Sequence, residues 1–337
     1  MLAEASTVIP EPPCQGVPLH RPVLLRETLA LLAPARGATG VDCTVGMGGH
    51  SRALLESVGP SGRVLGLERD AESLKRATKD LEEFRDCFLP VHADYRDLRN
   101  VLAERDIPSI DFLLADLGFS SFQMDSPARG FSFASEGPLD MRMDRSSGPT
   151  AADLLSEMDE EEIARTLREY GEERAAGRIA RAIVLERRTR PIRTTLHLAR
   201  IVERAAGGRR GLRIHPATRT FQALRIAVNR ELEGLGDFVK EGCRLLSPGG
   251  RAAFISFHSL EDRLVKQALI SLTERCLCPP GLPRCACGRP GIVERVSRKA
   301  VRPGEEEILS NPRSRSARLR VVRRLPGPTL PRPERRG

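Results

Sequence analysis

The stretch VDCTVGMGGHSRALLE, residues 41–56, decides the fold of this chain. An apolar run ends at Asp42, a burst of three glycines follows, and a helical pattern begins directly after them. The first amides of a helix have no intrahelical partner, so a strand, a glycine loop and a helix in this order form a pocket that accepts an anion or a compact polar group. The stretch therefore predicts a ligand-binding turn in an α/β protein.

Further short apolar runs resemble the one that leads into this turn. Counted together, the predicted strands cover residues 39–45, 63–68, 87–93, 111–117 and 251–257. Helical patterns lie between the first four strands, which predicts a parallel sheet with helices on both faces. More than 130 residues separate the fourth strand from the fifth, far beyond a normal crossover, so we expect an insertion there.

The insertion has the patterning of helices. Ile163, Leu167 and Tyr170 recur at helical spacing, and Gly171 breaks the pattern before the next helix. Apolar residues recur in the same way over residues 221–232, which predicts a long amphipathic helix that leads back into the sheet domain.

Length and charge bound the class of protein. A chain of 337 residues favours one large domain with an insertion, or two unequal domains. The sequence has neither a run of 18 apolar residues nor a basic and then apolar leader, which predicts a cytoplasmic protein. The whole chain has a net charge of +9, and residues 289–337 carry the same net charge, because they contain fourteen Arg or Lys and five Glu. A polyanionic partner such as nucleic acid and a solvated basic tail explain this segment equally.

The glycine loop fits more than one ligand. A dinucleotide fingerprint G-x-G-x-x-G that starts at Gly46 would need its third glycine where Ser51 stands. Glu68 closes the second predicted strand about 20 residues later, where the ribose of any adenosine cofactor would lie. Asp42 suits an ammonium group, and the small residues of the loop leave room for an amino-acid moiety, which favours S-adenosylmethionine over a dinucleotide. A plain tight turn is the alternative without a ligand.

Asp116 ends the fourth predicted strand, on the edge where open α/β sheets bind their ligands. Four of the thirteen Phe and Tyr residues follow within fifteen positions: Phe119, Phe122, Phe131 and Phe133. They form either core beneath a long loop or a surface on which an extruded base stacks. An exocyclic base amine attacks poorly because its lone pair is delocalised, so an acidic acceptor such as Asp116 would hold it in line with a sulfonium methyl group.

Nine sequence blocks in order carry a resemblance to one family. Among them are HRPVLL (20–25), GMGGHSRALL (46–55), DLGFSS (116–121), RGFSF (129–133) and SFHSLEDRLVK (256–266). Over roughly residues 20–322 the chain resembles the MraW family of bacterial small-subunit rRNA methyltransferases. These enzymes use S-adenosylmethionine to methylate N4 of a cytidine in 16S rRNA near the decoding centre.

The resemblance implies a Rossmann-like class I S-adenosylmethionine-dependent methyltransferase sheet with an inserted helical domain. The expected parts are a disordered lead (1–17), a methyltransferase core (18–124 and 217–325), a helical substrate-recognition insertion (125–216) and a disordered basic tail (326–337). The family pattern places cofactor contacts on Gly48, Gly49, His50, Glu68, Tyr95, Asp116 and Gln123. Asp116 is also the expected catalytic residue, and no metal is implied. Many members have Asp at the position of Glu68 and Phe at that of Tyr95, and both exchanges keep the needed chemistry.

The sequence therefore predicts an rRNA (cytosine-N4)-methyltransferase that acts on free small-subunit rRNA or on the assembled subunit. The alternatives are a DNA amino-methyltransferase and a non-catalytic RNA-binding assembly factor. DNA enzymes of this type typically carry a Pro pair and an aromatic residue after the acidic one, whereas this chain has DLGFSS. The target nucleotide and the oligomeric state, a homodimer included, stay open.

Several candidate residues have more than one interpretation. His50 supplies a backbone amide or caps the loop, and general-base catalysis is its less favoured role. His258 and Glu261 follow the fifth predicted strand and border the same cleft, unless a helix cap at Ser259 leaves them as solvated charges. The segment LDMRMD, residues 139–144, either orients the substrate or forms ion pairs between the domains.

Two segments near the C-terminus suggest a metal or a phosphate ligand. A C-x-C-x6-C-x-C pattern offers four thiolates for a structural zinc ion, although the family resemblance implies none. These residues are Cys276, Cys278, Cys285 and Cys287. NPRSRSARLRVVRR, residues 311–324, predicts an edge strand whose arginine face contacts RNA phosphates. Deletion of the residues after Arg313 is then expected to weaken RNA binding and its salt dependence.

Overall fold

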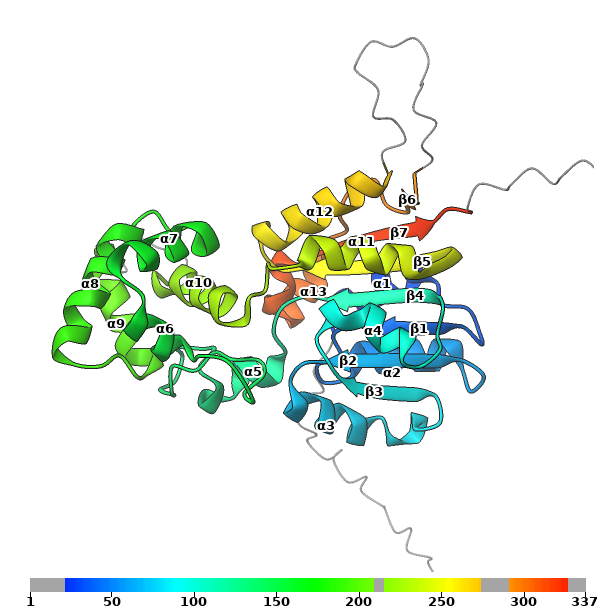
Figure 1. Ribbon diagram of the computed structural model, residues 1–337, viewed down its shortest axis with the longest axis horizontal. Helices are drawn as coiled ribbons and strands as arrows, with labels where there is room; N and C mark the ends of the chain where they lie inside the picture. The colour runs from blue at the N-terminus through cyan, green and yellow to red at the C-terminus, as the bar shows by residue number, and fades with distance from the viewer. Residues whose placement is uncertain (1–21, 209–214, 274–290, 327–337) are drawn as a thin grey trace, which may run out of the picture.

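The computed structural model describes residues 22–208, 215–273 and 291–326. Within them, seven strands form one sheet in the order β3-β2-β1-β4-β5-β7-β6 (Figure 1). The strands are β1 (Thr39–Asp42), β2 (Arg63–Glu68), β3 (Phe88–His92), β4 (Ile110–Asp116), β5 (Leu246–Ser256), β6 (Val293–Arg295) and β7 (Arg318–Arg324). β1 to β5 pair in parallel, and β7 runs antiparallel to both of its neighbours. All five predicted strands are confirmed.

Helices account for most of the remaining described chain. They are α1 (Leu25–Leu32), α2 (Gly49–Val58), α3 (Ala71–Asp80), α4 (Leu98–Ala103), α5 (Ser121–Asp125), α6 (Ala151–Glu157), α7 (Glu160–Gly171), α8 (Ala176–Thr189), α9 (Thr195–Ala206), α10 (Ala217–Asn229), α11 (Leu235–Leu245), α12 (Ser259–Thr273) and α13 (Glu305–Ser310). Short 3-10 turns are η1 (Glu82–Phe84), η2 (Tyr95–Asp97), η3 (Pro127–Arg129) and η4 (Pro312–Ser316). In the described part of the chain, no helix has the length and apolar character needed to cross a membrane.

The side chains of β4 explain why helices cover both faces of the sheet. Phe112 and Leu114 belong to a core cluster that includes residues of α1, α2 and α3. Leu113 and Ala115 belong to a second cluster with residues of α4, α11 and α12. Successive side chains of a strand face opposite sides, so a continuous apolar run becomes buried on both of them. The polar residue that ends the run, Asp116, is then left at the carboxyl edge of the sheet.

Helices α6 to α10 form a third core cluster, grouped to one side of the sheet (Figure 1). Ile163 of α7 and Ile179 of α8 lie in this cluster, as their helical spacing predicts. Helix α10 joins it through Phe221 and Leu224, although the sequence assigned residues from 217 onward to the sheet domain. Because its apolar face packs in the helical part, we propose that this part extends to the end of α10.

The position of β7 differs from its prediction as an edge strand. It lies between β5 and β6, and β6 forms the edge. Leu319 and Val321 are buried, as an interior strand requires. The prediction was wrong because β6 is only three residues long and gives no apolar-run signal in the sequence.

Three predictions concern segments outside the described residues. These are the disordered lead over residues 1–17, the basic tail over residues 326–337 apart from residue 326 itself, and the zinc ligands Cys276, Cys278, Cys285 and Cys287.

Candidate active site

A cavity of about 830 Å³ opens at the carboxyl edge of the sheet, and residues of α10 and η4 complete its walls. Parallel sheets bind their ligands at this edge. Both the sheet and the helical part contribute lining residues, so the cavity lies between them. Six of the seven predicted cofactor residues line it: Gly49, His50, Glu68, Tyr95, Asp116 and Gln123. The seventh, Gly48, belongs to the glycine loop but not to the lining.

The glycine loop has a backbone shape that other residues resist. Gly46 and Gly48 have φ angles of 54° and 81°, in the left-handed region that glycine adopts readily. At Gly49, an added Cβ would lie 2.4 Å from Cγ of Pro22. Larger residues would strain the loop or displace Pro22, so the compact backbone predicted from the sequence is present at the cavity.

Asp42 braces the glycine loop instead of facing the ligand. Its carboxylate accepts hydrogen bonds from Ser51 Oγ at 2.6 Å and from the Thr44 amide at 3.1 Å. The side chain is fully buried and does not line the cavity. Burial raises the pKa of Asp42 to about 6, with hydrogen bonds from Ser51 and Thr44 opposing the shift. The expected contact between Asp42 and an ammonium group therefore has no support in the geometry.

Glu68 connects the glycine loop to the start of α3. One carboxylate oxygen accepts a hydrogen bond from the Gly46 amide at 2.8 Å, and the other accepts one from the Asp70 amide at 2.9 Å. Burial raises the pKa of Glu68 to about 7, although these two bonds lower it. The residue lines the cavity at the end of β2, the position expected for an acidic group that binds ribose hydroxyls.

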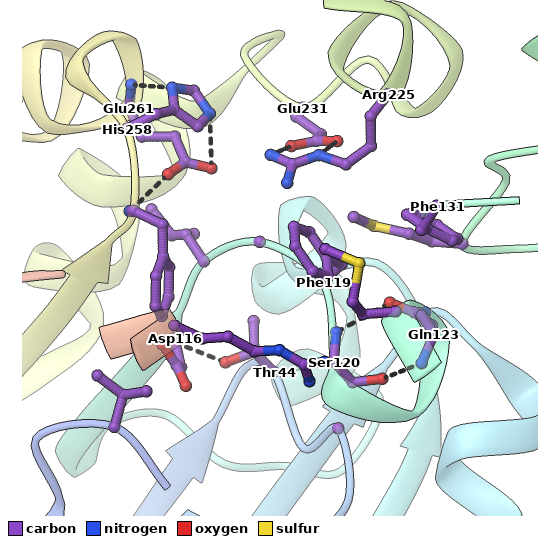
Figure 2. A pocket seen from close by; sticks show the side chains of 18 of the residues that line it. Thr44, Asp116, Phe119, Ser120, Gln123, Phe131, Arg225, Glu231, His258 and Glu261 are labelled. Carbon is purple, nitrogen blue, oxygen red and sulfur yellow. Dashed lines mark hydrogen bonds and ion pairs between the residues drawn. The ribbon is translucent and has the colours of Figure 1, made fainter. Parts of the chain in front are cut away.

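Asp116 lines the cavity (Figure 2), and one of its carboxylate oxygens is buried without a hydrogen-bond partner. Its amide donates to Thr44 Oγ1 at 2.6 Å, which fixes the end of β4, while its buried Oδ1 has no hydrogen-bond partner. Its Oδ2 lies 3.6 Å from Nδ1 of His50, and the other ring nitrogen of His50 lies 3.2 Å from the Val23 carbonyl oxygen. Burial raises the pKa of Asp116 well above its usual range, and the charges of Asp42 and Glu261 raise it further.

Tyr95 forms an aromatic wall of the cavity just beyond β3. Its hydroxyl donates to the Glu231 carbonyl oxygen at 3.3 Å, and its ring centroid lies 4.5 Å from that of Phe238. Burial raises the pKa of its hydroxyl, with a further contribution from Asp94, so the ring remains neutral. A fixed, neutral aromatic face suits the adenine stacking expected at this position.

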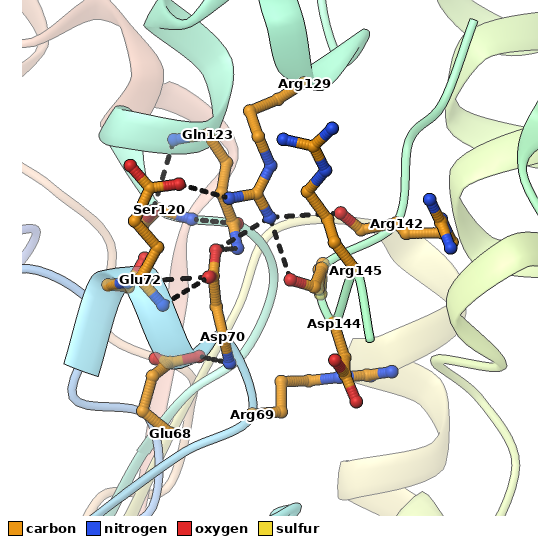
Figure 3. Close-up of polar contacts among 12 residues, drawn as sticks. Glu68, Arg69, Asp70, Glu72, Ser120, Gln123, Arg129, Arg142, Asp144 and Arg145 are labelled. Atoms are coloured by element: carbon orange, nitrogen blue, oxygen red, sulfur yellow. Dashed lines mark hydrogen bonds and ion pairs between the residues drawn. The ribbon is translucent and has the colours of Figure 1, made fainter. Parts of the chain in front are cut away.

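Gln123 holds the segment after β4 against the sheet domain (Figure 3). Its side-chain oxygen accepts from the Ser120 amide at 2.9 Å, and its amide nitrogen donates to Asp70 Oδ2 at 2.8 Å. Arg129 meets the same carboxylate oxygen at 2.7 Å and also donates to the Met143 carbonyl oxygen at 2.8 Å. This network joins α3, α5 and the segment that leads into the helical part.

The four clustered phenylalanines have divided roles. Phe119, Phe131 and Phe133 line the cavity, as the hypothesis of a base-stacking surface expects. Phe133 also packs its ring edge-on against Phe221, with centroids 4.8 Å apart, and so belongs to the rim of the helical core. Phe122 lies under the guanidinium of Arg76 at 3.9 Å and does not line the cavity.

The wall contributed by α10 and α12 contains two side-chain pairs, of which the sequence placed His258 and Glu261 at the cleft but did not single out Arg225 and Glu231. Arg225 donates to both carboxylate oxygens of Glu231, at 2.8 and 2.7 Å. Nε2 of His258 lies 3.1 Å from Oε1 of Glu261. Figure 2 shows both pairs across the cavity from Asp116. One signal for Arg225 existed, because a charged residue interrupts the apolar face of a predicted helix there.

The rim of the cavity carries arginines from η4. Arg313 and Arg315 line the opening, and Nη1 of Arg313 pairs with Asp125 of α5 at 3.1 Å. The arginines of β7 have a different role, because Arg318 and Arg320 both bind Asp262 of α12 at 2.7 Å. The predicted arginine face therefore divides into a rim at η4 and internal ion pairs on β7.

The charged side chains of the segment LDMRMD pair close by in the sequence, and Met143 of the segment lines the cavity. Arg142 pairs with Asp140 of the same segment at 2.8 Å, and Asp144 accepts from Ser146 at 2.8 Å. The contact with the helical part is made by the backbone, through a 2.7 Å hydrogen bond from the Met143 amide to Asn229.

The residues of the cavity fit S-adenosylmethionine. The compact backbone of residues 46–49 admits an amino-acid group, and Glu68 offers oxygens where ribose hydroxyls lie. Tyr95 offers a flat ring for adenine. Asp116 adds a carboxylate at the end of β4, and one of its oxygens has no hydrogen-bond partner.

Fold and site together define a class I, S-adenosylmethionine-dependent methyltransferase. Its mainly parallel sheet has an antiparallel strand, β7, between β5 and the edge strand β6. The model of the MraW methylase family matches residues 18–325, and the chain belongs to that family. Two proteins named ribosomal RNA small subunit methyltransferase H, from Syntrophotalea carbinolica and Thermomicrobium roseum, are 52% and 50% identical to this chain. The match covers 91% of this chain in both cases, and 98% and 94% of the two relatives. TrmN from Thermus thermophilus, a solved structure, is 15% identical with a TM-score of 0.39, over 90% of this chain and 48% of TrmN.

Proposed function

We propose that this protein transfers a methyl group from S-adenosylmethionine to N4 of a cytidine in small-subunit rRNA near the decoding centre, in the cytoplasm. The observation that carries the proposal is the buried oxygen Oδ1 of Asp116, an acceptor without a partner at the end of β4. An amino group on a base supplies the N–H that such an oxygen needs. The names of the two relatives support rRNA as the acceptor.

The carboxyl edge of the sheet would hold the methyl donor. S-adenosylmethionine supplies an electrophilic methyl group on a sulfonium when it is bound. The glycine loop, residues 46–49, would bind the amino-acid end, Glu68 would accept hydrogen bonds from the ribose hydroxyls, and Tyr95 would stack on the adenine. Each of these groups is already fixed by contacts within the protein, so binding requires little reorganisation.

Asp116 would orient the amine and take up a proton. Its Oδ1 accepts one N–H of the exocyclic amine, which aligns the nitrogen lone pair with the methyl group. The amine nitrogen would form the new N–C bond as the S–CH3 bond of the donor breaks and leaves a neutral thioether, and the nitrogen must then lose one proton. Burial raises the pKa of Asp116 first, and the charges of Asp42 and Glu261 add to the shift, so this carboxylate is a better base than an ordinary aspartate. No covalent enzyme intermediate is required.

Aromatic and basic residues would hold the RNA around the target base. Phe119 and Phe131 line the cavity with ring centroids 5.8 Å apart and offer faces for a flipped base. Arg313 and Arg315 lie at the opening, where the phosphates of the flanking nucleotides would pass.

Small ribosomal subunits that lack the modification, incubated with the purified protein and S-adenosylmethionine labelled on its methyl group, test this function. We expect label in N4-methylcytidine after digestion of the rRNA to nucleosides and mass spectrometry, and none with the Asp116→Ala variant. Free rRNA and duplex DNA serve as parallel substrates. Label in DNA alone would favour a DNA amino-methyltransferase, and RNA binding without label would favour an assembly factor. Either result would overturn the proposed reaction.

A further inference from the structure

The pair of His258 and Glu261 occupies the wall of the cavity across from Asp116 (Figure 2). His258 directly precedes α12, and its Nδ1 accepts a hydrogen bond from the Glu261 amide at 3.4 Å, so the histidine caps the first turn. Ser259, the cap expected from the sequence, instead donates to Glu172 at 3.0 Å. Because Nδ1 is the acceptor, Nε2 carries a ring proton.

The Nε2–H of His258 is a buried donor without an aligned acceptor. Nε2 lies 3.1 Å from Oε1 of Glu261, but the geometry does not satisfy a hydrogen bond. Glu261 is itself held in place, because its Oε2 accepts from the Phe257 amide at 2.9 Å. Buried donors in native structures almost always have a partner, so an unaligned one in the wall of a cavity points to a ligand.

The neighbouring cation on this wall is already committed. Arg225 uses Nε and Nη2 on Glu231 and lies over the ring of Phe119 at 4.6 Å from the centroid. Its charge is therefore compensated, and its position is fixed from both sides. The donor that this wall offers through His258 is by contrast directed by a helix cap.

We propose that Nε2–H of His258 donates a hydrogen bond to N3 of the target cytosine while Asp116 accepts from the N4 amine. This assignment rests on the proposed function. Cytosine presents an N–H donor at N4 next to an acceptor at N3, so one carboxylate and one N–H on opposite walls match this edge. Uracil presents the reverse pattern, with an acceptor at position 4 and a donor at N3. His258 is then a residue that selects the base, and Glu261 is a positioning residue that limits the movement of the ring.

Two variants separate the helix cap from the proposed donor. In His258→Asn the side-chain oxygen can still accept from the Glu261 amide, but the variant has no donor at the position of Nε2. In His258→Gln the amide nitrogen reaches about as far as Nε2 and keeps a donor there, at the expense of the cap. If His258 served only as a helix cap, His258→Gln would lose more activity than His258→Asn. If His258 is the proposed donor, His258→Asn loses more activity than His258→Gln.

The experiment compares two RNA substrates, one with cytidine and one with 3-deazacytidine at the target position, which lacks the N3 acceptor. For the wild type we expect a loss in kcat/KM of at least tenfold with 3-deazacytidine. For His258→Asn we expect kcat/KM on cytidine to fall at least tenfold below that of the wild type, and to fall less than a further threefold on 3-deazacytidine. His258→Gln should keep most of the wild-type difference in kcat/KM between the two substrates. Equal discrimination by the wild type and His258→Asn would overturn the assignment. Absence of N4-methylcytidine with the wild type would instead overturn the proposed function, and the assignment with it.

Discussion

At the scale of single residues, the site contains carboxyl groups whose pKa values are raised by burial. Asp42 and Glu68 have pKa values raised to about 6 and about 7, chiefly because burial disfavours the charged form. Asp116 is shifted in the same direction, for the same first reason. Groups of this kind cluster at functional sites, where they cost stability and supply reactivity.

Replacement of Asp116 separates these two effects. For Asp116→Ala we expect kcat to fall by about 10²–10³ or more, because the variant cannot align the amine or accept its proton. Isothermal titration should give a dissociation constant for S-adenosylmethionine within a few-fold of the wild type. Because the pKa of Asp116 is raised in the folded state, its ionisation opposes folding at neutral pH, and the variant should be at least as stable as the wild type. Near-normal turnover in this variant would remove Asp116 from the mechanism.

The buried carboxylate of Glu68 predicts how stability depends on pH. Its pKa is raised in the folded protein, so the folded state binds more protons than the unfolded state between pH 4.5 and about 7. Its contribution to stability is therefore complete below the unfolded pKa and is lost as the pH rises through the folded pKa. A shift from 4.5 to about 7 corresponds to roughly 3 kcal/mol.

Urea denaturation at a series of pH values tests this expectation with Glu68→Gln. The wild type should lose stability between pH 5 and pH 8, and the variant should lose less over the upper part of this range, while Asp42 still contributes near pH 6. The variant has one acceptor oxygen for the two amides of Gly46 and Asp70, so its absolute stability should be lower at pH 5. A pH slope unchanged by the substitution would show that Glu68 ionises normally.

At the scale of elements, one buried arginine holds three segments together (Figure 3). Arg129 of η3 is almost completely buried and meets the Asp70 carboxylate, which caps α3, at 2.7 Å. It also donates to the carbonyl oxygens of Arg142 and Met143, at 3.1 and 2.8 Å. Gln123 of α5 reaches the same carboxylate. Glu68, the acid at the expected ribose position, and the entry to the helical part are thereby connected through Asp70.

Removal of Arg129 should be costly, because it leaves the Asp70 carboxylate buried with fewer partners. We expect Arg129→Met to lower the free energy of unfolding by about 3 kcal/mol. Arg76→Met is the matched control, since Arg76 is half-exposed and its ion pair with Glu72 should contribute less than about 1 kcal/mol. Chemical denaturation of both variants measures the difference. Equal effects would mean that the Arg129 network has no special role.

The same network gives a second, pH-dependent readout. Burial raises the pKa of Asp70, but hydrogen bonds from Arg129 and Gln123 and the charge of Arg129 outweigh it, and the pKa is lowered. The stability from this group is present above the unfolded pKa of 3.8 and is lost as the pH falls through the folded pKa. Arg129→Met should therefore lose much of its disadvantage relative to the wild type below about pH 3.

At the scale of the whole molecule, the active site depends on the approach of two cores. The sheet supplies Asp116 and the glycine loop, while α10 in the helical core supplies Phe221 and Arg225 to the same cavity. The C-terminal segment completes the rim at η4 and then enters the sheet as β7. Deletion of everything after Arg313 is therefore unsuited as a test of RNA binding, since it would remove an interior strand of the sheet.

A single substitution tests the basic rim without disturbing the sheet. Arg315 is exposed and lines the opening of the cavity, so Arg315→Ala should weaken rRNA binding and reduce the slope of log K against log salt by about 0.7. Arg85→Ala is the control, because Arg85 is exposed and precedes β3, at the opposite edge of the sheet. Fluorescence anisotropy over a salt series measures both. An unchanged slope for Arg315→Ala would exclude a phosphate contact at this residue.

The sequence predicted the strands best where they are long and apolar. The five runs that form β1 to β5, and the helical character of the insertion, follow from the period of their apolar residues. The three-residue strand β6 carries no such signal, and without it β7 was taken for an edge. Phe221 was placed on the apolar face of a helix, but its spacing could not indicate that this face belongs to the helical core and not to the core of the sheet.

By itself, the sequence determined the α/β order, the glycine loop, the acidic residue at the end of β4 and, through nine sequence blocks, the family. These features depend on contacts between residues close in the chain or on residue identity. Only the tertiary structure decided that Asp42 braces the loop, that Arg129 meets Asp70, and that His258 lies across the cavity from Asp116. Burial and partners set the charge and orientation of such groups, and both depend on segments that are distant in sequence and meet only in the fold.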